Sequence, residues 1–197
     1  MPELQDTVRR LLLESAHTTE RTAEQSGMIA RMATALVEAY KRGNKILAFG
    51  NGGSACDAQN FADELVGRYE LTRPPLPALA LTTNTSDLTS IANDFGYDEV
   101  FARQLQAHAK PGDIAVAIST SGNSPNVLKA VQAARSLGLT ALGLTGESGG
   151  KLKPLCSLCL CVPSRSVARI QETHIVVIQI LCGIIEESLF PDAQKAH

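Results

Sequence analysis

The sequence predicts an α/β protein with a five-stranded parallel, doubly wound sheet, flanked by helices and preceded by an N-terminal helical extension. Short apolar runs alternate along the chain with longer segments of helical periodicity, as in sheets built from strand–helix–strand units. Two of these runs lead into loops rich in Gly, Ser and Thr, and such sheets bind ligands at the ends of their strands. The predicted strands cover residues 45–49, 78–81, 113–118, 140–144 and 157–162.

The segments around these strands show helical periodicity. Residues 4–42 repeat apolar side chains at three- and four-residue spacing, with a break between two helices expected at Gly27. The hydroxyl-rich segment 82–90 is expected to be a loop. The remaining helices are expected over residues 55–66, 98–109, 127–137 and 169–189.

Length and composition narrow the class of protein. The 197 residues carry a net charge of −2. Because the chain has no excess of basic residues, direct binding to nucleic acid is not expected. The first residues lack the charged and apolar segments of a secretion signal, and no segment is expected to span a membrane. We therefore expect a cytoplasmic protein with one domain over residues 1–197, made of N-terminal helices (1–42) and an α/β core (43–197).

The segment 119–124 lies between a predicted strand and a helix that starts near Pro125. The free N–H groups and the positive end of that helix favour an anion, and Ser124 is a good N-cap. We predict that a phosphate group binds here; an ordinary Ser/Gly-rich loop is the alternative. The hydroxyl groups that can donate to phosphate oxygens belong to Ser119, Thr120, Ser121 and Ser124.

A second glycine-rich loop follows the first predicted strand. Gly50, Gly52 and Ala55 fit a dinucleotide-binding pattern, but the second strand ends in residues 82–84 without an acidic residue to hold a ribose. NAD is rejected as a ligand on that ground. A P-loop sequence for nucleotides is also missing.

Two of the predicted helices carry polar side chains at helical spacing. Asn60 and Glu64 lie four residues apart, on one face of the first core helix, although most helix glutamates are solvated surface groups. Gln171 and Gln179 share one face of the last helix. His174 does not lie on that face and is expected to pack in the core.

Four motifs occur in order along the chain: Gly-Asn-Gly-Gly-Ser (50–54), Asn-Asp-Phe-Gly (93–96), Ser-Thr-Ser-Gly-Asn-Ser (119–124) and Arg-Ile-Gln-Glu (169–172). Together they resemble the sugar isomerase (SIS) family and, within it, the phosphoheptose isomerases. The resemblance covers essentially the whole chain and implies the SIS fold, a homotetramer and a sugar phosphate as ligand. It also implies interconversion of sedoheptulose 7-phosphate and D-glycero-D-manno-heptose 7-phosphate through an enediol, for the heptose of lipopolysaccharide.

The resemblance also assigns roles to positions of this sequence. Glu64 matches the family's catalytic base, and Gln179 stands at the position of a catalytic His. The family's zinc ligands fall on Glu64 and Gln171, together with the positions of Asn60 and Gln179. The substrate-binding positions are Asn51, Gly52, Gly53, Ser54, Asn93, Asp94, Ser119, Thr120, Ser121, Ser124 and Gln171.

This sequence departs from the family pattern where Asn60 and Gln179 stand in place of His. An amide is a poor zinc ligand beside imidazole and does not exchange a proton near neutral pH, which predicts impaired catalysis and weak zinc binding. Three interpretations stay open. They are an isomerase that uses Glu64 without zinc, a non-catalytic SIS protein that binds sugar phosphate or a partner such as the replication initiator DnaA, and an inactivated copy of the isomerase.

Overall fold

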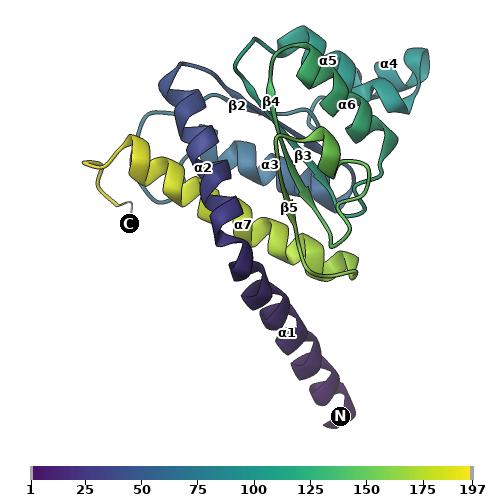
Figure 1. Ribbon diagram of the computed structural model, residues 1–197, viewed down its shortest axis with the longest axis vertical. Coiled ribbons are helices and arrows are strands. Elements are labelled where there is room, and N and C mark those ends of the chain that lie inside the picture. Colours follow the sequence, from purple (N-terminus) through teal and green to yellow (C-terminus); the bar gives the residue numbers. More distant parts are fainter. Residues whose placement is uncertain (1, 196–197) are drawn as a thin grey trace.

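The computed structural model describes residues 2–195, with a five-stranded sheet at its centre (Figure 1). The strands pair in the order β2-β1-β3-β4-β5, and every pair is parallel. The predicted fold class is confirmed. The strand order reverses between β1 and β3, and ligands bind at such a point in open α/β sheets. The strands are β1 (Ile46–Gly50), β2 (Ala78–Ala80), β3 (Ile114–Ser119), β4 (Thr140–Thr145) and β5 (Leu158–Cys161).

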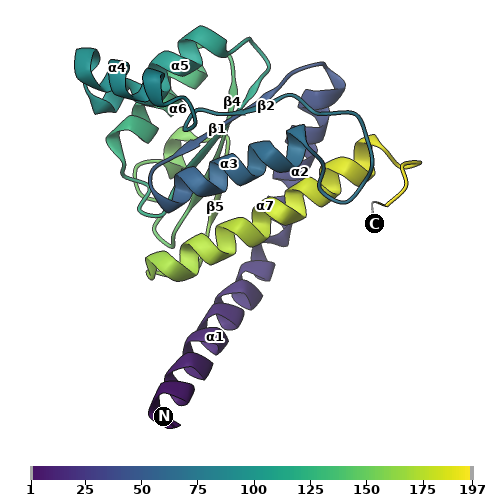
Figure 2. The ribbon, with the colours of Figure 1, turned by 180° about the vertical axis from the view of Figure 1, so that it is seen from behind.

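Helices cover both faces of the sheet, because its strands are apolar on both sides. One core lies under α2, α3 and α7, where Leu36, Phe61 and Ile178 are fully buried. The other core lies under α5 and α6, around Phe101 and Val131. Figure 2 shows α3 and α7 together on the same face of the sheet. The helices are α1 (Pro2–Thr22), α2 (Ser26–Lys41), α3 (Gly53–Val66), α4 (Thr85–Phe95), α5 (Val100–His108), α6 (Pro125–Ser136) and α7 (Val167–Leu189).

The N-terminal region forms two helices, but the expected break at Gly27 is wrong. A short 3-10 helix at Ala23–Gln25 separates α1 from α2, and Gly27 lies in the first turn of α2. A Cβ atom at that position would meet no described atom within 4 Å, so no packing contact distinguishes glycine from other residues here. The first turn of a helix also lacks intrahelical partners for its N–H groups, which makes it tolerant of glycine.

α1 extends away from the sheet as a separate arm (Figure 1). Its side chains Leu4 and Leu12 are each 66% exposed, and Val8 is half exposed. These residues are the apolar positions of the predicted N-terminal pattern. The apolar face of α1 is therefore not used within the described part of the chain.

The expectation of a loop over residues 82–90 is wrong, because α4 begins at Thr85. The Asn84 side chain caps this helix by accepting hydrogen bonds from the N–H groups of Ser86 (3.1 Å) and Asp87 (3.3 Å). The Thr89 hydroxyl group donates to the Thr85 carbonyl oxygen at 2.7 Å. The hydroxyl groups thus bond within the helix, and composition alone predicted the wrong element.

The last helix is long and apolar enough to cross a membrane, by length and composition alone. α7 covers 23 residues, with a mean hydropathy of 1.3 in its most apolar window. No other helix within residues 2–195 is both long and apolar enough to span a membrane. Half of that window is buried inside the fold. Val177, Leu181 and Ile185 pack in the core shared with α2 and α3, so the apolar character of α7 serves the interior of the protein.

Candidate active site

The predicted phosphate loop lies at the carboxyl end of β3, directly before α6. The hydroxyl groups of Ser119 and Ser124 are 3.2 Å apart and hydrogen-bonded to each other. The turn requires glycine at Gly122, where φ is +64° and an added Cβ atom would lie 2.2 Å from the Gly149 carbonyl oxygen. The chain therefore brings two hydroxyl groups and the N-terminal end of α6 together, an arrangement that suits an anion.

Ser124 occupies the N-cap position of α6, as predicted, but its hydroxyl group caps no N–H group among the described residues. It bonds Ser119 instead. The N–H group of Val127 is satisfied by the Asn126 side chain at 2.9 Å. Ser124 is therefore the N-cap by position, while the Asn126 side chain accepts the N–H group of Val127.

A pair of asparagines joins the two glycine-containing loops. Asn51 and Asn126 exchange hydrogen bonds in both directions, at 2.8 and 2.9 Å. The Tyr97 hydroxyl group donates to the Asn51 side-chain oxygen at 3.1 Å. The sequence analysis did not identify Asn126 or Tyr97, and the sequence offers no signal for either beyond their positions next to the motifs at 119–124 and 93–96.

The first turn of α3 lies against the Gln171 side chain of α7. A Cβ atom on Gly53 would lie 2.3 Å from Gln171 Nε2, so the end of the Gln171 side chain lies directly against the Gly53 backbone. Gly52 and Gly53 are exposed beside it, whereas Ser54 is 3% exposed and packs inward. The loop and Gln171 are thus placed together, and the hydroxyl group of Ser54 is turned away from solvent.

Asn60, Glu64 and Gln179 form one hydrogen-bonded cluster between α3 and α7. The Gln179 Nε2 atom donates to Asn60 Oδ1 at 2.8 Å and to Glu64 Oε1 at 3.3 Å. Asn60 Nδ2 donates to the same carboxylate oxygen at 3.4 Å. The helical spacing in the sequence predicted the pair on α3, and the fold adds Gln179 to it. Two amides therefore hold one carboxylate oxygen of Glu64.

This cluster does not fit the zinc ion that the family resemblance implies. Amide nitrogens carry no lone pair for a metal, and the Asn60 oxygen already accepts the Gln179 amide. Zinc prefers imidazole, thiolate and carboxylate ligands. Within residues 2–195, no group of three or more His, Cys, Asp or Glu side chains is arranged to hold a metal ion.

A groove of about 400 Å³ runs along the α3–α7 contact. Asp57 on its wall was missed by the sequence analysis: it is 8% exposed, and its Oδ2 atom is buried without a hydrogen-bond partner in the described chain. Burial raises the pKa of this carboxyl group to about 6. Its three-residue spacing from Asn60 was the only available signal. The groove is lined by Gly53, Cys56, Asp57, Asn60, Gln171, Glu172 and Ile175.

The raised pKa of Asp57 predicts a pH-dependent stability difference. A carboxyl group whose folded pKa exceeds its unfolded value stabilises the fold when protonated, and this contribution is lost as pH rises through about 6. Asp57→Asn should therefore increase the free energy of unfolding by about 1–3 kcal/mol at pH 8 and by little at pH 4. Urea unfolding at both pH values checks this, with the exposed Asp63→Asn as the control. An equal effect of Asp57→Asn at both pH values would contradict it.

The remaining predicted residues lie apart from this groove. Thr120 and Ser121 line a second groove of about 530 Å³, together with Arg165 and Ile170. Asn93 and Asp94 are exposed at the end of α4 and bond each other at 2.8 Å. No hydrogen bond among residues 2–195 joins this pair to Glu64 or to the phosphate loop.

His174 is fully buried, as expected for a packing residue. Its Nε2 atom donates to the Thr145 carbonyl oxygen at 3.1 Å. Burial lowers the pKa of the imidazole to about 4, so it is neutral at physiological pH. It therefore does not replace the missing His at position 179.

Comparison with known proteins finds close similarity in sequence and in overall structure. A phosphoheptose isomerase from Trichlorobacter lovleyi is 52% identical over 168 residues, 85% of this chain and 86% of the relative. The solved phosphoheptose isomerase GmhA from Neisseria gonorrhoeae is 41% identical, with a TM-score of 0.88 over 93% of this chain and 99% of that one. A phosphoheptose isomerase from Francisella tularensis is 37% identical, with a TM-score of 0.90 over 93% and 98%.

The sequence model of the SIS domain family matches residues 12–146 of this chain, from α1 through β4. This range includes both loops at the carboxyl ends of β1 and β3, and also Asn60 and Glu64 on α3. The chain therefore belongs to the SIS domain family.

Proposed function

We propose that this chain is an aldose–ketose isomerase that converts sedoheptulose 7-phosphate to D-glycero-D-manno-heptose 7-phosphate. The observation that carries the proposal is the close relation to phosphoheptose isomerases, at 52% identity over most of the chain and with matching solved structures. The pairing of an anion-binding loop with a carboxylate held between α3 and α7 agrees with that activity.

In the proposed reaction the phosphate group of the sugar binds at the loop of Ser119 and Ser124. The Glu64 carboxylate takes the proton from C1 of the ketose, the C–H electrons form a C1–C2 double bond, and the C2 carbonyl oxygen takes up a proton. The resulting enediol then loses the O1 proton and regains a proton at C2, which gives the aldose. Gln179 and Asn60 hold Glu64 in place through their amides.

The site works without zinc in this proposal, since the amides of Asn60 and Gln179 do not supply metal ligands. Position 179 offers no titratable side chain that could carry the proton between O1 and O2. We therefore expect slow turnover, limited by proton transfer and not by substrate binding.

The experiment that tests the function is an assay of aldose formation from sedoheptulose 7-phosphate, with and without added zinc. Fructose 6-phosphate and unphosphorylated sedoheptulose serve as controls for chain length and for the phosphate. We expect turnover of the seven-carbon phosphate in preference to both. Binding without any aldose product would favour the non-catalytic interpretation.

The phosphate loop gives a second prediction. Ser119→Ala with Ser124→Ala should weaken sugar-phosphate binding by about 1–3 kcal/mol per charged hydrogen bond lost. The reason is that the two hydroxyl groups lie together beside the N-terminal end of α6, where an anion is favoured. Calorimetric titration measures the loss, with Ser136→Ala at the far end of α6 as the control. Unchanged affinity in the double variant would show that this loop is not the phosphate-binding site.

Assembly is the third prediction. We propose a cytoplasmic homotetramer that serves the synthesis of lipopolysaccharide heptose, with α1 and α7 in its interfaces. Leu4 and Leu12 on α1 and Ile180 on α7 are exposed apolar side chains that a partner copy would cover. Light scattering should give about four times the mass of the chain, and Leu4→Glu with Leu12→Glu should reduce it. A monomer at micromolar concentration would contradict the proposal.

A further inference from the structure

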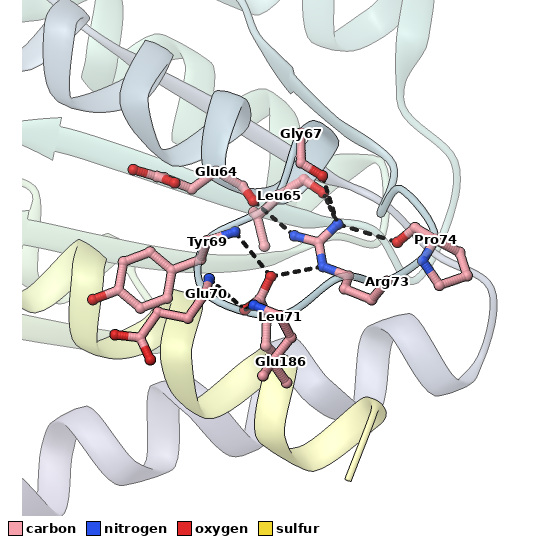
Figure 3. A network of polar contacts seen from close by, with 9 residues as sticks. All are labelled: Glu64, Leu65, Gly67, Tyr69, Glu70, Leu71, Arg73, Pro74 and Glu186. Carbon is pink, nitrogen blue, oxygen red and sulfur yellow. Dashed lines mark hydrogen bonds and ion pairs between the residues drawn. The ribbon is translucent and has the colours of Figure 1, made fainter. Parts of the chain in front are cut away.

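A buried ion pair lies next to the backbone of Glu64, the proposed catalytic base. The Nε atom of Arg73 donates to Glu186 Oε1 at 2.8 Å, and the two side chains are 0% and 1% exposed. Arg73 belongs to the connection after α3, and Glu186 to α7. Figure 3 shows the pair between these two segments. Neither residue lines the groove along the α3–α7 contact.

The guanidinium group of Arg73 holds the end of α3. Its Nη2 atom donates to the Glu64 carbonyl oxygen at 2.7 Å, and its Nη1 atom donates to the Leu65 carbonyl oxygen at 2.7 Å and to that of Gly67 at 3.2 Å (Figure 3). The last carbonyl groups of a helix have no partner within the helix, and a cation suits that end. Arg73 therefore stabilises the turn that carries Glu64.

Glu186 fixes the position of Arg73. Its carboxylate accepts the N–H groups of Tyr69 (2.9 Å), Glu70 (2.8 Å) and Leu71 (2.8 Å) in addition to Arg73. Burial alone would raise the pKa of Glu186, but these donors outweigh it and the pKa is lowered. The group thus stays charged and anchors the whole connection after α3 to α7.

The contacts close a ring around Glu64. The Glu64 backbone bonds Arg73, Arg73 bonds Glu186, and Glu186 lies on the same helix as Gln179, which donates to the Glu64 side chain at 3.3 Å. The backbone of Glu64 is therefore connected to α7 through Arg73 and Glu186, and its carboxylate is connected to α7 through Gln179. We propose that Arg73, anchored by Glu186, is a positioning residue that sets the Glu64 carboxylate for proton transfer.

This inference rests on the proposed isomerase function, and a purely structural role is the alternative. A buried ion pair is weak evidence for stability, because desolvation offsets the attraction of the charges. If the pair only stabilises the fold, its substitution should lower the melting temperature without changing the chemistry of the folded enzyme. If the pair positions Glu64, its substitution should lower kcat even in folded enzyme, because small displacements of a catalytic group reduce the rate.

The structure offers a matched control at the end of the sheet opposite the phosphate loop. Asp113, 1% exposed, accepts the N–H groups of Lys45 (3.0 Å) and Lys110 (2.8 Å) and pairs with the Lys45 side chain. Like Glu186, it is a buried carboxylate held by backbone donors and a basic side chain. It precedes β3, whereas the phosphate loop follows that strand.

The experiment compares Glu186→Gln and Arg73→Lys with Asp113→Asn, each assayed well below its melting temperature. Arg73→Lys is the milder variant, since an ammonium group keeps the charge but does not reach Glu186 and two carbonyl groups at once. We expect kcat to fall about tenfold or more in both site variants, with KM changed by less than about threefold. Asp113→Asn should keep kcat within about twofold while losing thermal stability.

Chemical rescue adds a readout that a structural role would not move. Arg73→Ala should regain activity when guanidinium is added below denaturing concentrations, and not with the same concentration of sodium chloride. Equal kcat in Glu186→Gln, Arg73→Lys and Asp113→Asn would overturn the positioning role alone. Absence of aldose formation by the unmodified protein would instead overturn the proposed function, and the positioning inference with it.

Discussion

Glu64→Gln is expected to lower kcat for aldose formation by about 10²–10⁴-fold, with little change in KM. The substitution removes the base but keeps its surroundings, because an amide oxygen at position 64 still accepts the Gln179 and Asn60 amides. Substrate affinity should survive, since the phosphate loop is separate from this cluster. Steady-state kinetics on sedoheptulose 7-phosphate measures both constants.

The control for this variant is Asp63→Asn, which changes the neighbouring exposed carboxylate of α3. It should leave kcat within about twofold, because Asp63 makes no contact with the cluster of Asn60, Glu64 and Gln179 among the described hydrogen bonds. A Glu64→Gln variant that keeps most of its activity would assign the base to another residue. Asp57, buried on the groove wall, would then be the first group to test.

The double substitution Asn60→His with Gln179→His is expected to raise kcat about tenfold or more and to create zinc binding. General acid–base assistance contributes about 10²–10⁴-fold in rate, and the present amides supply none of it. The side chains of Asn60 and Gln179 already meet at 2.8 Å beside Glu64, so two imidazoles there would face the same carboxylate. Metal analysis and steady-state kinetics on the same preparation test both parts.

Single substitutions separate the two roles in that prediction. Gln179→His alone should restore part of the rate through proton transfer, whereas Asn60→His alone should change turnover little. Zinc binding in the double variant without a gain in turnover would favour the binding-protein interpretation. A gain that persists after the metal is removed would assign the effect to the imidazole at position 179.

The sequence predicted the sheet and the ends of its strands well, because each of these features is local. Strands such as Ile114–Ser119 are apolar runs, and the spacing of Asn60 and Glu64 follows from helix geometry alone. The placement of Gln179 beside Glu64 needed the packing of α3 on α7, and only the family resemblance suggested it. Local patterns thus gave the components of the site but not their assembly.

The contacts that the sequence did not reveal join residues far apart in the chain. Asn51 and Asn126 are 75 residues apart, and Arg73 and Glu186 are 113 apart. Asn51 belongs to a predicted motif, but its sequence does not show that Asn126 is its partner, and nothing in the sequence around Arg73 and Glu186 marks them as a pair. The helix at Thr85–Phe95 was missed for a different reason, since its capping residue Asn84 and its hydroxyl groups look like a loop in composition.

The most direct test of isomerisation through Glu64 without zinc is the rate of aldose formation by unmodified protein in the presence of a metal chelator. The account predicts slow but measurable conversion of sedoheptulose 7-phosphate, unchanged by the chelator and at least about 10²-fold faster than that of Glu64→Gln. Conversion that stops when the chelator is added, or that does not exceed the Glu64→Gln background, would contradict it.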